Sequence, residues 1–149
     1  MKKYELTEET FTVYGKTLYR IRAVRDFGSV KTGEFGGYIE KEENLSHFGD
    51  AWVYGNAKVY GNAWVYGNAE VFNTRHFFVQ GPIGSRDGYV TFYRTKDDTV
   101  EVRCGCFSGS LQEFVNQVEE THGGSRYEKE YKLAAELAKV CIRLEGESR

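Results

Sequence analysis

The chain has 149 residues and a mass of 17.1 kDa, a length that fits one domain or two small modules sharing a core. Hydrophobic residues make up 40% of it and charged residues 28%, which excludes a disordered tail, and no apolar run approaches the roughly 20 residues of a membrane-spanning helix. Lys and Arg number 20 against 22 Asp and Glu, so a net charge of −2 provides no positive field for nonspecific nucleic-acid binding.

The N-terminal residues and the cysteines predict the cellular compartment of the protein. No apolar run follows the basic first residues, so we expect no secretory signal and no membrane partner. Cys104, Cys106 and Cys141 are odd in number, which is typical of a reducing cytoplasm. A Cys-x-Cys pair with one distant cysteine lacks the spacing of a structural zinc site, so we predict neither a metal nor a cofactor.

Residues 1–34 are predicted to form a β-hairpin cap. Strand-forming residues flank the turn at Tyr14-Gly15-Lys16, and side chains alternate in character over the next eight residues. The arginines on this second strand are interpreted as a solvated face.

Residues 35–76 contain a six-residue repeat, Val-Tyr-Gly-Asn-Ala-x, which is most regular from Val53 onwards. A period of six fits neither an α-helix nor a heptad, but it fits a coil whose flat faces each use six residues. Ala57 and Val59 are two residues apart, so an extended segment turns both toward one side, and Gly-Asn then forms the corner. Three faces would close a coil of 18 residues, which is the spacing that places Val53 over Val71.

The residues on either side of each Val are expected to point outward and to form an interface. A row of exposed aromatic rings on a small protein usually marks a contact surface, and we expect a homo-oligomer. The alternative is that flanking segments cover these rings. The predicted interface residues are Trp52, Tyr54, Tyr60, Trp64 and Tyr66.

The repeat resembles that of the hexapeptide-repeat proteins, which form left-handed parallel β-helices. Those repeats place an aliphatic residue first and a small residue fifth, as at Val59 and Ala63. The resemblance implies a short left-handed parallel β-helix of about two coils over residues 35–76. Many such proteins are trimeric acyltransferases, which is one alternative for the activity, but this segment is shorter than their prisms. His47 is interpreted as a coil-end residue and not as a catalytic base.

Residues 77–149 are predicted to form an α+β module with the order β-β-β-α-α, so the whole chain is mainly β. Its strands are expected over residues 77–80, 89–93 and 99–104, with loops at 81–88 and 105–109. Ser110 and Ser125 are each followed three residues later by Glu, which is the capping box that begins a helix. The first helix should end at Gly123 and the second near Gly146.

The two loops of this module have the chemistry of an anion site. The segment from Gly105 leads into a helix N-terminus, whose amides and dipole favour negative charge. If the loops are adjacent, they would hold a phosphate or carboxylate while Tyr89 or Phe107 stacks on a base. The predicted anion-binding residues are Gly84, Ser85, Arg86, Ser108, Gly109 and Ser110. Alternatively, both loops are simple connectors, because neither matches a phosphate-loop pattern.

A catalytic alternative pairs a Cys106 thiolate with His122 as its base. His122 lies at the far end of the helix that begins after Ser110, about 18 Å along its axis. We therefore predict no catalytic residues and a non-enzymatic protein.

The whole chain is also similar to a loose group of phage- and prophage-encoded proteins with Tyr-Gly-Asn-Ala-x-Val arrays and segments like 81–86 and 104–114. The group has no settled activity. We expect a counter-defence binding protein in the host cytoplasm, whose partner is a host defence protein such as a CRISPR effector. The alternative is a sponge that sequesters a phosphorylated nucleotide signal. No direct binding of nucleic acid is expected.

Overall fold

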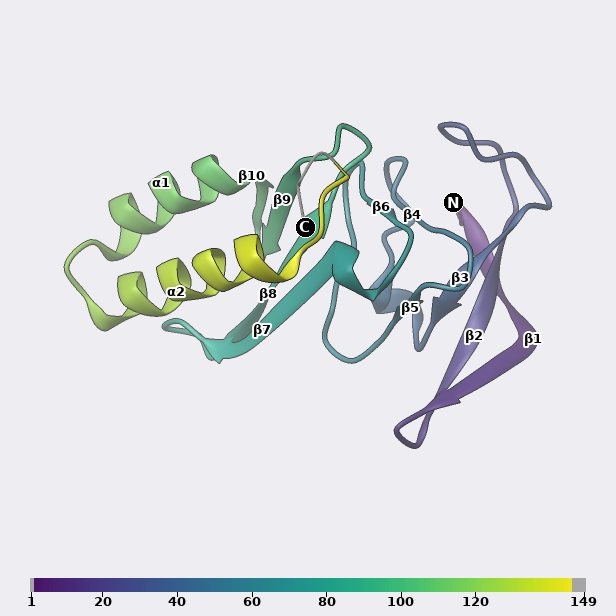
Figure 1. Cartoon of the computed structure of the whole chain (residues 1–149), viewed down its shortest axis with the longest axis horizontal. Helices are drawn as coiled ribbons and strands as arrows, with labels where there is room; N and C mark the ends of the chain where they lie inside the picture. The colour runs from purple at the N-terminus through teal and green to yellow at the C-terminus, as the bar shows by residue number, and fades with distance from the viewer. Residues whose placement is uncertain (1, 146–149) are drawn as a thin grey trace.

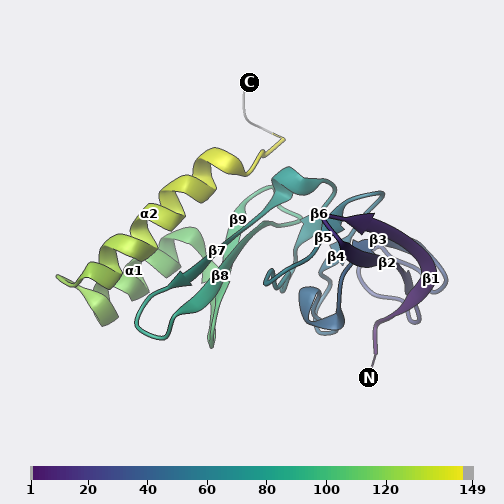
Figure 2. The same cartoon turned by 90° about the horizontal axis from the view of Figure 1, so that it is seen from below.

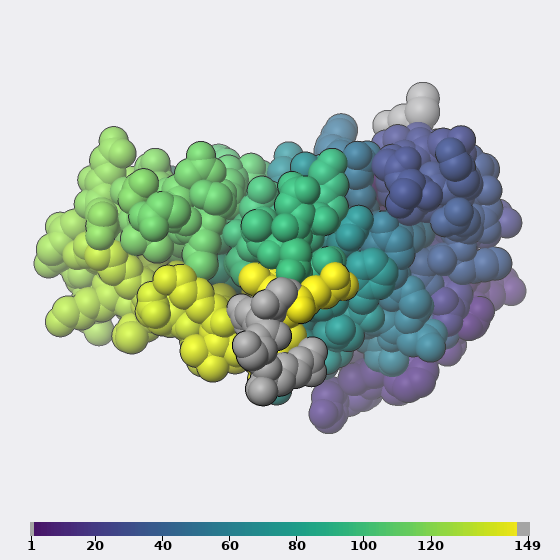
Figure 3. Space-filling model, turned by 45° about the horizontal axis from the view of Figure 1, so that its top comes forward, coloured from purple at the N-terminus to yellow at the C-terminus, as the bar shows by residue number. Residues whose placement is uncertain are grey.

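A computed structural model describes residues 2–145 of the chain. The molecule is elongated, with a β-hairpin at one end and two helices at the other (Figures 1 and 2). Figure 3 shows the N-terminal segments at one end and the helical segments at the other, with the last described residues running back toward the middle of the molecule. Among residues 2–145, no helix combines the length and apolar content that crossing a bilayer requires.

The expected N-terminal hairpin is present. Strands β1 (Tyr4–Val13) and β2 (Lys16–Ala23) pair antiparallel, and Tyr14 and Gly15 make the turn with φ angles of 49° and 77°. On its other edge β2 pairs antiparallel with β3 (Phe35–Ile39), the strand that opens the repeat segment. The hairpin therefore packs on the repeat and also supplies two of the four strands, β1 and β2, of the sheet that contains β3.

The predicted left-handed parallel β-helix is wrong. One four-stranded sheet is mixed and the other antiparallel, the third sheet is a two-stranded parallel pair, and residues 2–145 form no run of stacked parallel coils. Parallel pairing within the sheets is confined to β3 with β5 and to β4 with β6, with two residue pairs in each. The strands concerned are β4 (Trp52–Val53), β5 (Lys58–Val59) and β6 (Glu70–Val71). The repeat is short, and the antiparallel β2 takes the edge on which a further parallel coil would have to stack.

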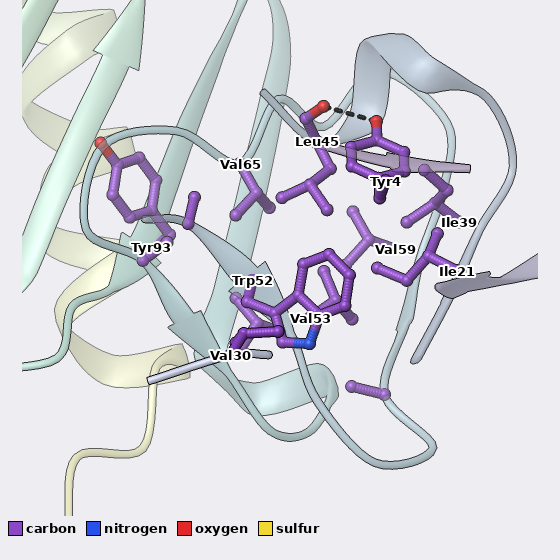
Figure 4. Packing of buried hydrophobic residues seen from close by; sticks show 14 of the residues in the cluster. Tyr4, Ile21, Val30, Ile39, Leu45, Trp52, Val53, Val59, Val65 and Tyr93 are labelled. Atoms are coloured by element: carbon purple, nitrogen blue, oxygen red, sulfur yellow. Dashed lines mark hydrogen bonds between the residues drawn. The ribbon is translucent and has the colours of Figure 1, made fainter. Parts of the chain in front are cut away.

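The burial that the six-residue period predicts is nevertheless confirmed. Every Ala and Val of the repeat is 5% exposed or less, and Val53 pairs with Val71 as the spacing indicates. The residues concerned are Ala51, Val53, Ala57, Val59, Ala63, Val65, Ala69 and Val71. Figure 4 shows their core with Tyr4, whose hydroxyl donates a hydrogen bond of 2.7 Å to the carbonyl of Leu45. The period therefore specified which side chains are buried and the pairing of Val53 with Val71, but not the antiparallel pairing of β3 with β2.

The C-terminal half is an antiparallel sheet covered by helices on one face. Its strand order is β10-β9-β8-β7. The strands are β7 (Phe77–Ile83), β8 (Gly88–Arg94), β9 (Val100–Cys104) and β10 (Phe107–Ser110). Because side chains alternate along β8, Phe92 packs in the core under the helices while Tyr93 packs in the core of the repeat. One sheet therefore joins the two cores. Strand β10 replaces most of the predicted loop at 105–109.

The helices are α1 (Leu111–His122) and α2 (Arg126–Cys141). The capping box at Ser110 is confirmed, since Ser110 and Glu113 exchange side-chain and backbone hydrogen bonds. The one at Ser125 is wrong: the Ser125 hydroxyl donates to the carbonyl of His122, and Glu128 accepts from the amide of Gly124. Helix α2 ends at Cys141, before the expected end at Gly146, which lies outside the described residues.

Candidate binding site

A cavity of about 660 Å³ lies at one end of the C-terminal sheet. Its wall includes the neighbouring ends of β8 and β9, the turn between β7 and β8, the turn at Gly105 and Cys106, helix α1, one residue of α2 and two residues of the repeat. Five aromatic side chains line it: Trp64, Tyr89, Phe107, Phe114 and Tyr131. A cavity of this volume and apolar character is typical of a small-molecule site.

The described part of the chain lines the cavity with two arginines and with no carboxylate. Arg86 and Arg103 line it, and the lining residues that the structure describes include neither Asp nor Glu. Neither arginine forms an ion pair with any residue from 2 to 145. The cavity therefore presents uncompensated positive charge beside aromatic rings.

Arg103 is held in place by aromatic rings and not by carboxylates. Its guanidinium lies 4.2 Å from the ring centroid of Trp64 and 4.4 Å from that of Tyr66. Its Nε is buried and has no hydrogen-bond partner among the residues that the structure describes. Arg86 differs, because it is exposed on the β7–β8 turn. One guanidinium is thus oriented in advance and the other is free to reach a ligand.

The predicted anion-binding residues are only partly brought together. Ser85 and Arg86 line the cavity, as do the expected stacking residues Tyr89 and Phe107. Gly84 is buried, and its amide donates a hydrogen bond of 2.7 Å to Glu130. The Gly84 amide is therefore already hydrogen-bonded to the Glu130 carboxylate of the same chain.

Ser108, Gly109 and Ser110 lie on β10 and do not line the cavity. The amide of Ser110, at the N-terminus of α1, donates to a Glu113 carboxylate oxygen at 2.8 Å. This hydrogen bond and the one with the Ser110 side chain hold the pKa of Glu113 below its ordinary value. The N-terminus of α1 thus already carries an acidic group of this chain.

Cys106 and His122 both line the cavity. The length of helix α1 alone predicted that they lie far apart. Strand β10 leads away from the Cys106 turn for about 13 Å, and α1 then runs back for about 18 Å. The His122 ring packs against Tyr131, with ring centroids 5.5 Å apart. Burial raises the pKa of the Cys104 thiol, which also lines the cavity. Among residues 2–145, no three Asp, Glu, His or Cys side chains lie close enough to hold a metal ion.

The expected exposure of Trp52 is wrong. Its side chain is 1% exposed, because Tyr4 and Phe27 from the N-terminal region pack against it at centroid distances of 6.1 and 5.1 Å. Trp64 is exposed to 38% and remains at the surface beside the cavity. The other three predicted interface residues, Tyr54, Tyr60 and Tyr66, are half-buried.

His47 has a structural role in the N-terminal region. Its Nδ1 accepts the amide of Lys3 at 3.0 Å, its Nε2 lies 2.8 Å from a Glu42 carboxylate oxygen, and its ring stacks on Tyr4 at 4.1 Å. Both ring nitrogens are therefore engaged within the fold.

Sequence analysis missed Arg103 as a site residue. The alternation of β9 predicts that it faces away from Val102, but no local pattern pairs it with Trp64, which lies far away in the sequence. Only the packing of the sheet against the repeat brings the two together.

No protein-family model matches the chain, and no similar protein was found among the curated proteins. The assignment to the hexapeptide-repeat proteins is therefore unsupported by sequence and is contradicted by the sheet topology. The likeness to phage-encoded repeat proteins falls with it.

Proposed function

We propose that the protein binds a small aromatic anion, such as a phosphorylated nucleotide, in the cavity at the end of the C-terminal sheet. The observation that carries the proposal is the pairing of aromatic walls with two arginines that have no ion-pair partner among residues 2–145. Guanidinium groups hold phosphate oxygens through paired hydrogen bonds, and aromatic rings stack on bases.

In this proposal the arginines bind the phosphate and the aromatic side chains stack on the base. Arg103, fixed on Trp64, would hold the phosphate from the wall, while Arg86 would close over it from the turn. The Tyr89 ring lies against Gly81, where a Cβ atom would come within 2.5 Å of it. A ring held in this way loses little freedom when a base stacks on it, which favours binding.

The proposed action is sequestration, with no catalytic step. The three cysteines are free. Because free thiols persist in a reducing compartment, we place the binding in the cytoplasm.

The test is titration calorimetry with the common 5′-mononucleotides, 3′,5′-cyclic AMP and ADP-ribose. We expect at least one of them to bind, and Arg86→Ala to weaken its Kd at least about tenfold, the scale of a charge-assisted hydrogen bond. Arg22→Ala is the matched control, because Arg22 lies on β2 at the opposite end of the molecule and pairs with Glu5. Absence of binding by every probe, or equal affinity of the Arg86 variant, would refute the proposal.

A second candidate is the binding of a partner protein, for which a CRISPR effector complex is the probe. It is favoured by the exposure of Trp64 to 38%, since large exposed rings are typical of protein interfaces. A purified effector complex that binds the wild type and the Arg86→Ala variant equally, but not Trp64→Ala, would support this candidate over the first.

A further inference from the structure

A second hollow, of about 710 Å³, adjoins the cavity. Asn62 and Trp64 line both of them, so the two form neighbouring parts of one concave surface. On its other side the second hollow is bounded by the turn η1 (Glu42–Asn44) and by residues that follow it, up to Phe48.

Two exposed aromatic rings face this second hollow. Phe48 is exposed to 74% and Trp64 to 38%. Among the residues that the structure describes, the rings of Phe48 and Trp64 make no contact with each other, while Arg103 covers one face of the Trp64 ring. Both side chains line the hollow, so a planar group that enters it can stack on at least one of them.

The second hollow carries charges of both signs, since Lys41 lines it together with two glutamates. Its lining includes Glu42, which is already paired with Lys2 at 3.3 Å and with His47. It also includes Glu43, which is exposed and forms no ion pair with residues 2–145. Carboxylates repel phosphate, but they accept hydrogen bonds from the amino and imino groups of a base. Because Lys41 offsets the charge of Glu43 in the lining, the second hollow suits a neutral ring with N–H donors.

We propose that the ligand is a dinucleotide, an inference that rests on the proposed function of the cavity. Its phosphate lies on Arg86 and Arg103, and one base stacks on the aromatic wall beside them. The second base enters the adjoining hollow between Phe48 and Trp64, with its N–H edge toward Glu43. The placement follows from the linings: among the described residues, the cavity carries two arginines and no carboxylate, whereas the hollow carries a lysine together with two glutamates.

The experiment compares the 5′-mononucleotides with the 5′-phosphorylated dinucleotides that combine them, by calorimetry on the full chain. We expect the best dinucleotide to bind about tenfold more tightly than the best mononucleotide, the scale of one additional stacked base. Phe48→Ala should abolish that advantage and leave mononucleotide affinity unchanged. Phe35→Ala is the control, since Phe35 is 60% exposed and lines neither hollow.

The outcomes separate the two proposals. If a mononucleotide binds but no dinucleotide binds more tightly, the dinucleotide inference is wrong and the proposed function stands. If the dinucleotide advantage survives in Phe48→Ala, the second hollow is not its source and the inference is again wrong. If neither class binds, the proposed function fails and the inference fails with it.

Discussion

Replacing Lys3 with methionine tests how the N-terminal strand is anchored. Lys3 is fully buried, its ammonium donates a hydrogen bond of 2.6 Å to the carbonyl of Ala51, and it lies 4.7 Å from the centroid of the Phe27 ring. Burial, with a contribution from the charge of Arg25, lowers the pKa of Lys3 from 10.5 to about 8. The fold thus holds a lysine that loses its proton far more readily than a lysine in water.

The sign of the resulting pH dependence follows from proton binding. Between about pH 8 and 10.5 the unfolded chain keeps the Lys3 proton while the folded chain has released it. Stability therefore rises with pH in this window. From pH 7.5 to 9.5 the rise contributed by Lys3 is about 2 kcal/mol, obtained from the two pKa values at about 1.4 kcal/mol for each pKa unit.

Urea unfolding at these two pH values measures the effect. The free energy of unfolding of the wild type minus that of Lys3→Met should increase by about 2 kcal/mol from the lower pH to the higher. Taking this difference cancels titrations common to both proteins, such as those of the tyrosines. Lys2→Met, at a side chain that is 66% exposed, controls for the loss of one lysine. A difference that stays constant or falls with pH would refute the reasoning about Lys3.

Two further predictions concern the backbone around the hollows. Asn44→Ala should destabilise the fold by about 3 kcal/mol or more in urea unfolding, because the buried side chain makes four hydrogen bonds with backbone groups; a loss below about 1 kcal/mol would contradict this role. Gly84→Ala should cost about 2 kcal/mol, since Gly84 has a φ of +80° and its added methyl would overlap the Tyr131 hydroxyl. Gly88→Ala is the matched control, with no atom within 4 Å of the added carbon, and an equal loss in both variants would argue against the strain.

Local patterns predicted the parts of the fold that depend on neighbours in the sequence. The capping box at Ser110 began a helix as expected, because its bonds join residues three apart. Strand β10, by contrast, was missed at Phe107, since its glycine- and serine-rich composition is typical of a loop. It is a strand only because β9 pairs with it across a tight turn.

The candidate site was predicted in part for the same reason. Arg86, Tyr89 and Phe107 were chosen for their chemistry, and the structure places them on one cavity. The aromatic contacts of Arg103 and the position of His122 could not be predicted, because they depend on how the sheet packs on the repeat and how α1 reverses direction.

The sequence by itself determined which side chains of the repeat are buried, where the hairpin turns and where helix α1 begins. Each of these follows from spacing, turn residues or caps that act over a few residues. Only the tertiary structure decided that the strands form mixed and antiparallel sheets, that Trp52 is covered and that two hollows meet at Trp64. The physical reason is that a period of six specifies an inward face, whereas the partner of a strand edge is set by whichever distant segment satisfies its hydrogen bonds.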